Sequence, residues 1–95
     1  MESYVYIIHS HTSGKFYVGE CPNLDNRLKW HNDSFFNTNT TRTGIPWELF
    51  YFIKCKSREQ ARKIEKHIKR MKSRIYIENL KKYPQIAIKL LKKYK

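Results

Sequence analysis

The stretch that decides the fold is YVYII at residues 4–8 followed by FYVG at residues 16–19. Both runs are rich in β-branched and aromatic residues, which favour strands. The polar segment between them contains Ser13-Gly14, a pair typical of a turn. We therefore expect an antiparallel hairpin. Because side chains alternate between the two faces of a strand, Tyr6 and Tyr17 can share one face of the sheet.

Three further segments follow before the middle of the chain. Asn23 can cap a helix over residues 24–31, with Leu24 and Leu28 facing inward. Residues 32–44 are rich in Asn, Thr and Ser and predict a long loop, of the kind that is usually functional or mobile. Residues 47–53 (WELFYFI) are almost continuously apolar, so we expect a third strand in the centre of the sheet.

The rest of the chain predicts three helices. Residues 57–60 (SREQ) form a capping box, and the helix that it opens runs to about residue 72. A short helix over residues 74–82 and a last one from Pro84 follow. Apolar spacing predicts the buried side chains Ala61, Ile64, Ile68, Met71, Ile86, Ala87, Leu90 and Leu91. The predicted fold is α/β (α+β), with a small, three-stranded, mostly antiparallel sheet flanked by helices.

Length and charge restrict the class of protein. Ninety-five residues allow one compact domain over residues 1–95. The net charge of +12 lies entirely in residues 48–95, which hold sixteen basic and four acidic residues, whereas residues 1–47 hold four of each. Such a one-sided charge indicates a binding surface for a polyanion. The two cysteines are isolated, and no signal peptide or membrane-spanning stretch is evident, so we expect a cytoplasmic protein.

One acidic residue stands out on the basic helix. Glu65 lies beside Ala61 and Ile68 on the border of the apolar stripe, so it points toward the sheet. A carboxylate there could hold Mg²⁺, which takes oxygen ligands and leaves positions open for phosphate. The plainer alternative is an ion pair within the helix, with Lys69 or Arg62.

The other candidates are weaker when each is taken alone. Arg27 can grip two phosphate oxygens, or it can be a solvated arginine on a helix face. His31, one turn later, can shuttle a proton or be a structural histidine. Tyr6 and Tyr17 can organise a water in an electropositive site, although most tyrosines serve packing. The pair HSH at residues 9–11 has no partners for a zinc site. The basic C-terminal stretch can lie on a membrane or, more simply, on the core.

In this order, the residues resemble a known family. YVY at residues 4–6 and YVG at residues 17–19 resemble the paired motif of the GIY-YIG nucleases. Arg27 and His31 fall on the first helix, and Glu65 on the later one, as in that family. The TRTGIPWEL segment at residues 41–49 and the basic run after Glu65 resemble the small stand-alone bacterial members, which are described as excinuclease-like. The resemblance spans about residues 4–82, followed by a helix over about residues 84–95. Tyr4 stands where the name-giving glycine would be, and we expect no additional DNA-recognition domain.

The resemblance implies a metal-dependent endonuclease that hydrolyses DNA phosphodiester bonds, with a role in repair or recombination of branched or damaged DNA. Glu65 would hold Mg²⁺ or Mn²⁺, and Arg27 would stabilise the charge that builds up on the phosphate. Tyr6 or Tyr17, helped by His31, would orient or deprotonate the attacking water. Asn79 lies near a late asparagine of the family and is a further candidate. The basic residues expected on DNA are Lys15, Lys29, Arg42, Arg62, Lys66, Lys69 and Arg70.

Two other functions stay open at this point. The chain could be a basic nucleic-acid-binding module that keeps the fold without cutting, or a subunit that docks on an acidic protein or on ribosomal RNA. We expect no membrane partner, and a monomer or a weak homodimer. The nuclease hypothesis predicts that the tyrosines, Arg27 and Glu65 converge on one shallow, positive cleft.

Overall fold

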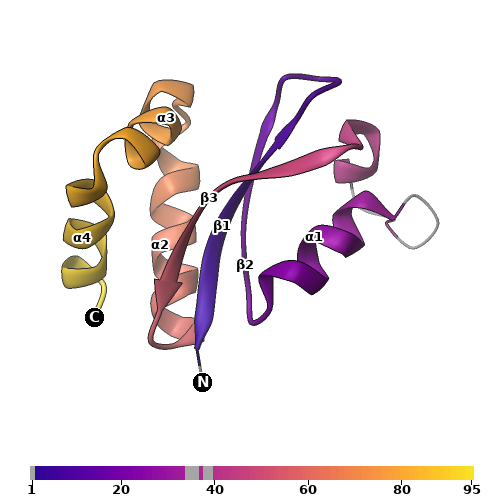
Figure 1. Ribbon diagram of the computed structural model, residues 1–95. Coiled ribbons are helices and arrows are strands. Elements are labelled where there is room, and N and C mark those ends of the chain that lie inside the picture. The colour runs from indigo at the N-terminus through magenta and orange to yellow at the C-terminus, as the bar shows by residue number, and fades with distance from the viewer. Residues whose placement is uncertain (1, 34–36, 38–39) are drawn as a thin grey trace.

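The computed structural model describes residues 2–33, 37 and 40–95, and its centre is a three-stranded sheet (Figure 1). The strands are β1 (Ser3–Ser10), β2 (Phe16–Cys21) and β3 (Trp47–Cys55). Their order is β2-β1-β3, and β1 pairs antiparallel with both neighbours. The predicted hairpin and the antiparallel sheet are confirmed.

Helices cover both faces of this sheet. They are α1 (Leu24–Asn32), α2 (Arg58–Met71), α3 (Arg74–Lys82) and α4 (Pro84–Lys93), with a short 3₁₀ helix η1 (Thr40–Gly44). Figure 1 shows α1 and η1 on one side of the sheet and α2, α3 and α4 on the other. The predicted α+β fold is therefore confirmed. Of the predicted long loop, residues 34–36 and 38–39 lie outside the described residues, and residues 40–44 form η1 instead.

Side-chain caps explain where three helices begin. Asn23 Oδ1 accepts a hydrogen bond from the backbone N–H of Asn26 at the start of α1. Ser57 Oγ accepts one from the N–H of Gln60 at the start of α2, and Ser73 does the same for α3. Each cap satisfies a backbone N–H that the helix itself leaves without a partner. In the capping box of α2, however, Gln60 Oε1 accepts from the N–H of Lys56, one residue earlier than expected.

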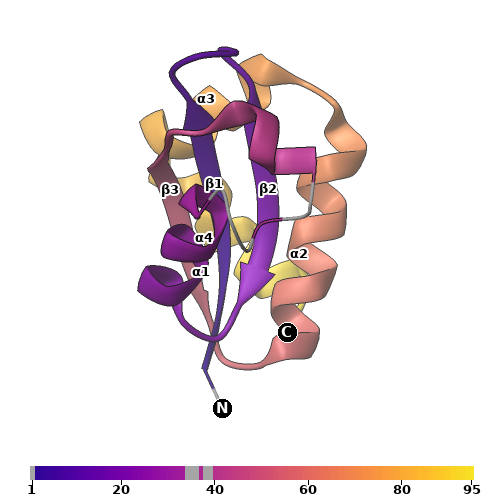
Figure 2. The same cartoon turned by 90° about the vertical axis from the view of Figure 1, so that its right-hand side faces the viewer.

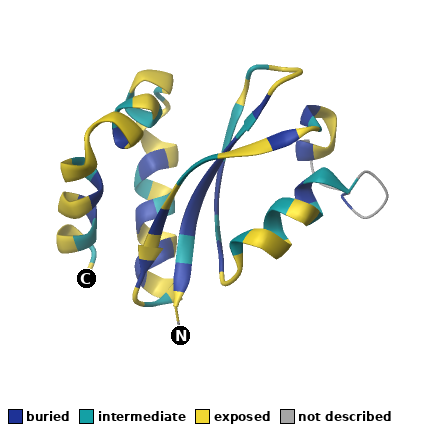
Figure 3. Cartoon of the chain, in the orientation of Figure 1, coloured by how far each residue is buried: buried dark blue, intermediate teal, exposed yellow. Residues whose placement is uncertain are grey.

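The third strand lies at the edge of the sheet, so its predicted central position is wrong. Among the described residues β3 pairs only with β1, and β1 is the strand between two neighbours. The apolar run suggested burial on both faces, yet Phe52 is 46% exposed and Leu49 is 36% exposed. Helix α1 covers only part of the face on which it packs, which leaves apolar side chains of β3 in contact with solvent (Figure 3).

Two hydrophobic clusters lie on opposite faces of the sheet. The larger contains Val5, Ile7 and the buried residues of α2, α3 and α4, whereas the smaller contains Tyr6, Ile8, Cys21 and Trp47. All the predicted α2 stripe is buried except Met71, which is 46% exposed. No helix in residues 2–33 or 40–95 is long and apolar enough to cross a membrane.

Candidate active site

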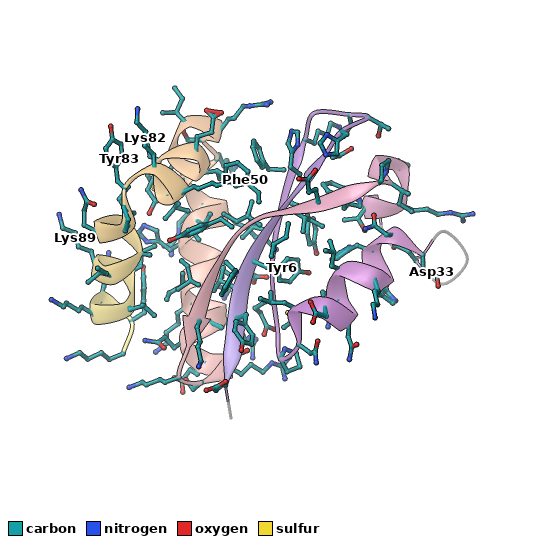
Figure 4. All side chains as sticks on the ribbon, in the orientation of Figure 1. Tyr6, Asp33, Phe50, Lys82, Tyr83 and Lys89 are labelled. Carbon is teal, nitrogen blue, oxygen red and sulfur yellow. The ribbon has the colours of Figure 1, made fainter. Side chains whose placement is uncertain are left out.

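The strand register brings the two motif tyrosines together. Tyr6 lies opposite Gly19 and Ile8 lies opposite Tyr17, so both phenol rings lie on the α1 face, with their centroids 6.3 Å apart. Figure 4 shows Tyr6 projecting from β1 toward α1. A Cβ added at Gly19 would lie 2.6 Å from Tyr6 Cζ and closer still to its hydroxyl. Glycine at this position therefore leaves the space that the Tyr6 ring occupies.

His31 of α1 is the direct partner of Tyr6. Its Nε2 shares a 2.8 Å hydrogen bond with the Tyr6 hydroxyl, and its ring lies 5.1 Å from that of Tyr17. Burial, and secondarily the positive charge of Arg27, lower the pKa of His31 to about 4. Burial, with Tyr17 next in effect, raises the pKa of Tyr6 above its ordinary value. Both groups are therefore neutral at pH 7, and a neutral imidazole has a nitrogen free to accept a proton.

A second layer of polar residues holds His31 in place. Thr41 Oγ1 lies 2.9 Å from His31 Nδ1, and it also accepts a hydrogen bond from Asn37 Nδ2. The same amide donates to the carbonyl of His31, and the Trp47 indole N–H donates to the carbonyl of Thr41. The sequence reasoning missed the buried Asn37 and Thr41. Their polar surroundings predict a loop and carry no signal that two of its side chains turn inward.

Arg27 lies on α1 close to both neutral groups. Its positive charge lowers the pKa of Tyr6 and of His31, which places the guanidinium within electrostatic reach of both. The side chain is half-buried, with the guanidinium 5.8 Å from the centre of the Trp30 ring, and it lines a shallow depression with Asn23 and Asn26.

Glu65 lies on α2 and has the smallest of the electrostatic effects on the Tyr6 hydroxyl. Its negative charge raises the pKa of Tyr6, although α2 and α1 pack on opposite faces of the sheet. This is possible because β2 is an edge strand, and Figure 2 shows β2 between α1 and α2. Glu65 also pairs with Lys69 at 3.6 Å, and the Lys69 ammonium lies 5.7 Å from the centre of the Tyr17 ring. Glu65 is thus largely buried, as its inward orientation predicts, and it makes the ion pair that was the alternative to a metal role.

A single carboxylate suits one kind of metal site. Among the described residues, no group of three or more His, Cys, Asp or Glu side chains could enclose a metal ion. The Glu65 side chain is 19% exposed, so it can be reached from solvent. Mg²⁺ is commonly held by one or two carboxylates, with waters and substrate phosphates as its other ligands. The residues therefore fit a divalent ion bound by Glu65 together with water and substrate.

The remaining candidates lie around this centre or away from it. Exposed basic side chains extend along the hairpin turn, α1, η1 and α2: Lys15, Lys29, Arg42, Arg62, Lys66, Lys69 and Arg70. Asn79 lies on α3, which packs against α2 and α4 on the face opposite α1. His11 pairs with Glu48 rather than with a set of metal ligands.

Known proteins resemble this chain over most of its length. The model of the GIY-YIG catalytic domain matches residues 2–82. The chain is similar to the UPF0213 protein BH0048 from Bacillus halodurans, solved by solution NMR, with 32% identity and a TM-score of 0.52. That match covers 84% of this chain and 82% of the other. A search of curated proteins gives no significant match. The chain belongs to the GIY-YIG family, whose members are nucleases that generally depend on divalent metal ions.

Proposed function

We propose that the protein is a metal-dependent endonuclease that hydrolyses phosphodiester bonds in DNA. The observation that carries this proposal is the chain of contacts that runs around the edge strand β2. Tyr6 shares a 2.8 Å hydrogen bond with His31 of α1 and lies beside Tyr17, and Lys69, which pairs with Glu65 of α2 at 3.6 Å, lies 5.7 Å from the centre of the Tyr17 ring. Arg27 of α1 and Glu65 of α2 thus supply a cation and an anion to this edge, and each has an electrostatic effect on Tyr6 that is smaller than that of burial. Binding and activating a phosphodiester does require both charges.

In the proposed reaction, Tyr6 and His31 handle the proton of the attacking water. The water oxygen bonds to phosphorus while the bond from phosphorus to the 3′ oxygen breaks, and the leaving 3′ oxygen takes up a proton from solvent. The water proton passes to the Tyr6 hydroxyl as Tyr6 gives its own proton to His31 Nε2, which lies 2.8 Å away. For Nε2 to accept this proton, His31 must start as the tautomer that has its N–H on Nδ1. In that tautomer Nδ1–H donates to Thr41 Oγ1. Tyr17, half-buried beside this pair, orients the water.

Arg27 and Glu65 act on the phosphate. The guanidinium of Arg27 offers paired N–H donors to the non-bridging oxygens, whose charge increases in the transition state. Glu65 would hold the divalent ion, which supplies Lewis-acid stabilisation of the phosphate when it is bound. Lys69 has to release the Glu65 carboxylate at that stage, and its half-exposed side chain is free to move toward solvent.

One observation favours a second candidate function, a DNA-binding module that does not cut. The Glu65–Lys69 ion pair is complete without a metal, and with the net charge of +12 it would serve a binding module equally well. The two functions differ in what Glu65 does. In a nuclease the carboxylate is essential for cleavage, whereas in a binding module its removal only lessens the repulsion of phosphate.

The deciding experiment measures cleavage of labelled single-stranded, duplex, flap and branched DNA with Mg²⁺ or Mn²⁺. The wild-type protein is compared with Glu65→Gln and with a matched control, Glu59→Gln. Glu59 lies on the same helix and pairs with Lys63 at 3.2 Å, but its side chain is 79% exposed. We expect cleavage by the wild type and by Glu59→Gln, and a loss of at least about 100-fold in Glu65→Gln.

Absence of cleavage by the wild type on every form, with DNA binding intact, would reject the nuclease and support the binding module. Equal cleavage by the wild type and Glu65→Gln would reject the assigned role of Glu65.

Within the same proposal, residues 1–95 act as one domain, as a monomer or weak homodimer, on branched or damaged DNA in repair or recombination. The free thiols of Cys21 and Cys55 suit the reducing cytoplasm.

A further inference from the structure

A basic depression lies on the side of β2 that faces α2. It is formed where the turn between β1 and β2 meets the end of α2 and the start of α3, and we call it the hairpin groove. Its charged lining residues are Lys15, Lys69, Lys72 and Arg74, and no acidic residue of the described part of the chain lines it. Four positive charges around one depression, without a carboxylate, favour an anionic occupant.

Contacts between distant parts of the chain hold the walls of the hairpin groove. Arg74 Nη1 donates a 3.1 Å hydrogen bond to the carbonyl of Gly14, sixty residues earlier. The same guanidinium lies 5.1 Å from the centre of the Phe16 ring. The turn and the α2–α3 junction are therefore joined by a basic side chain, which lines the groove and also fixes its width.

Lys72 is held in an unusual backbone conformation. It follows the last residue of α2 with φ 47° and ψ 40°, in the left-handed region. Glycine is the residue that most often ends a helix in this way, because any Cβ is crowded there. Lysine has a Cβ and therefore does not avoid this crowding. In return, the helix ends with a positive side chain on the wall of the hairpin groove.

The hairpin groove is connected to the candidate active site. Lys69 lines the groove, and its ammonium also lies 3.6 Å from the Glu65 carboxylate and 5.7 Å from the centre of the Tyr17 ring. Lys15 lines the groove and also a second depression beside Tyr17 and Thr41. A chain of phosphates that passes Tyr17 would thus meet these lysines next.

We propose that the hairpin groove binds the phosphate of DNA next to the one that is cut, and that Lys69 moves from Glu65 to this phosphate when DNA binds. The inference rests on the proposed function, since the neighbouring phosphate is defined by the cleavage site. It assigns the path of the bound strand across the edge strand β2, from the Tyr6 hydroxyl to Lys72. Lys72 and Arg74 are accordingly substrate-positioning residues.

The test uses Lys72→Gly, because glycine fits the left-handed backbone while it removes the charge. Lys15→Ala is a second, independent variant in another part of the chain. The matched control is Lys89→Ala, which removes the same charge from α4, well separated from Tyr6 in Figure 4. The affinity for a fluorescein-labelled DNA duplex is measured by anisotropy over a series of salt concentrations, without metal, and thermal melts confirm that each variant folds.

Each lost phosphate contact lowers the slope of log K against log salt by about 0.9. If the ionic contribution vanishes near 1 M salt, that slope corresponds to about eightfold weaker binding at 0.1 M. We expect this change in Lys72→Gly and in Lys15→Ala, and none in Lys89→Ala. In cleavage assays we expect Lys72→Gly to raise KM and leave kcat unchanged.

Three results would each overturn the groove proposal. The first is a wild-type slope in folded Lys72→Gly and Lys15→Ala, and the second is an equal decrease of the slope in Lys89→Ala. The third is that the wild type does not bind DNA. Failure of the proposed function looks different. In that case the wild type does not cleave DNA, but the two groove variants still lose their phosphate contacts. Cleavage with unchanged slopes would reject the groove alone.

Discussion

Acid should destabilise the fold through His31. The pKa of this imidazole is lowered to about 4 in the folded protein, by burial first and by Arg27 second, from an ordinary 6.5. The unfolded chain therefore takes up a proton near pH 6.5, while the folded chain resists protonation until about pH 4. Since the unfolded state binds more protons in this window, the free energy of unfolding falls as the pH falls.

The size of the effect follows from the two pKa values. One pKa unit corresponds to about 1.36 kcal/mol, so the full shift is worth about 3 kcal/mol, and most of it is lost between about pH 7 and pH 4.5. A small domain has only about 5–15 kcal/mol of stability, so this loss is easily measured. The measurement is urea unfolding, followed by circular dichroism, across this range.

The control is His31→Gln, which cannot take up the proton. Carboxylates and the partly buried His67, whose pKa is also lowered by burial, titrate in both proteins and cancel in the difference. We expect the stability of the wild type to fall more steeply with acid than that of His31→Gln. Parallel curves for the two proteins would refute the claim that His31 is buried in its neutral form.

Two further substitutions test the candidate site. Gly19→Ala should lower the free energy of unfolding by about 2 kcal/mol, because its methyl group would lie 2.6 Å from Tyr6 Cζ; a urea midpoint equal to that of the wild type would contradict this packing. Arg27→Lys keeps the charge but loses the paired donors, so we expect single-turnover cleavage to slow by about 10- to 100-fold while metal-free DNA affinity is kept. An unchanged rate would show that Arg27 acts only as a point charge.

The local patterns of the sequence predicted most elements, because strand alternation and helix caps act over a few residues. The predicted caps Asn23 and Ser57 lie at the observed helix starts for that reason. The errors concern long-range packing. The apolar pattern of residues 47–53 indicates which side chains avoid water. It does not indicate whether one strand or two pair with this segment, so it could not place β3 at the edge of the sheet. Met71 has the spacing of a buried residue, yet spacing gives only a direction and does not supply a partner in that direction.

The sequence predicted the residue types of the candidate site but not the hydrogen bonds and contacts between them. Tyr6, Tyr17, Arg27 and Glu65 were found from the motif, and the structure brings charges from both helices to the Tyr6 hydroxyl. The sequence could not show that His31 forms its hydrogen bond with Tyr6 rather than with Tyr17, because the partner depends on how α1 crosses the sheet. Whether these residues catalyse hydrolysis stays a prediction until cleavage is measured.

The central strand β1 has a consequence for how this protein can change over time. Val5 and Ile7 are buried in the cluster under α2, while Tyr6, between them in sequence, faces the opposite cluster and His31. A change in the size of Val5 or Ile7 shifts the backbone that carries the Tyr6 hydroxyl, although neither side chain faces the site. Evolutionary change in the interior is thereby tied to the position of the tyrosine that we propose as catalytic. Val5 and Ile7 are therefore restricted in size by the tyrosine between them, and a laboratory search for variants with altered activity should include these two positions.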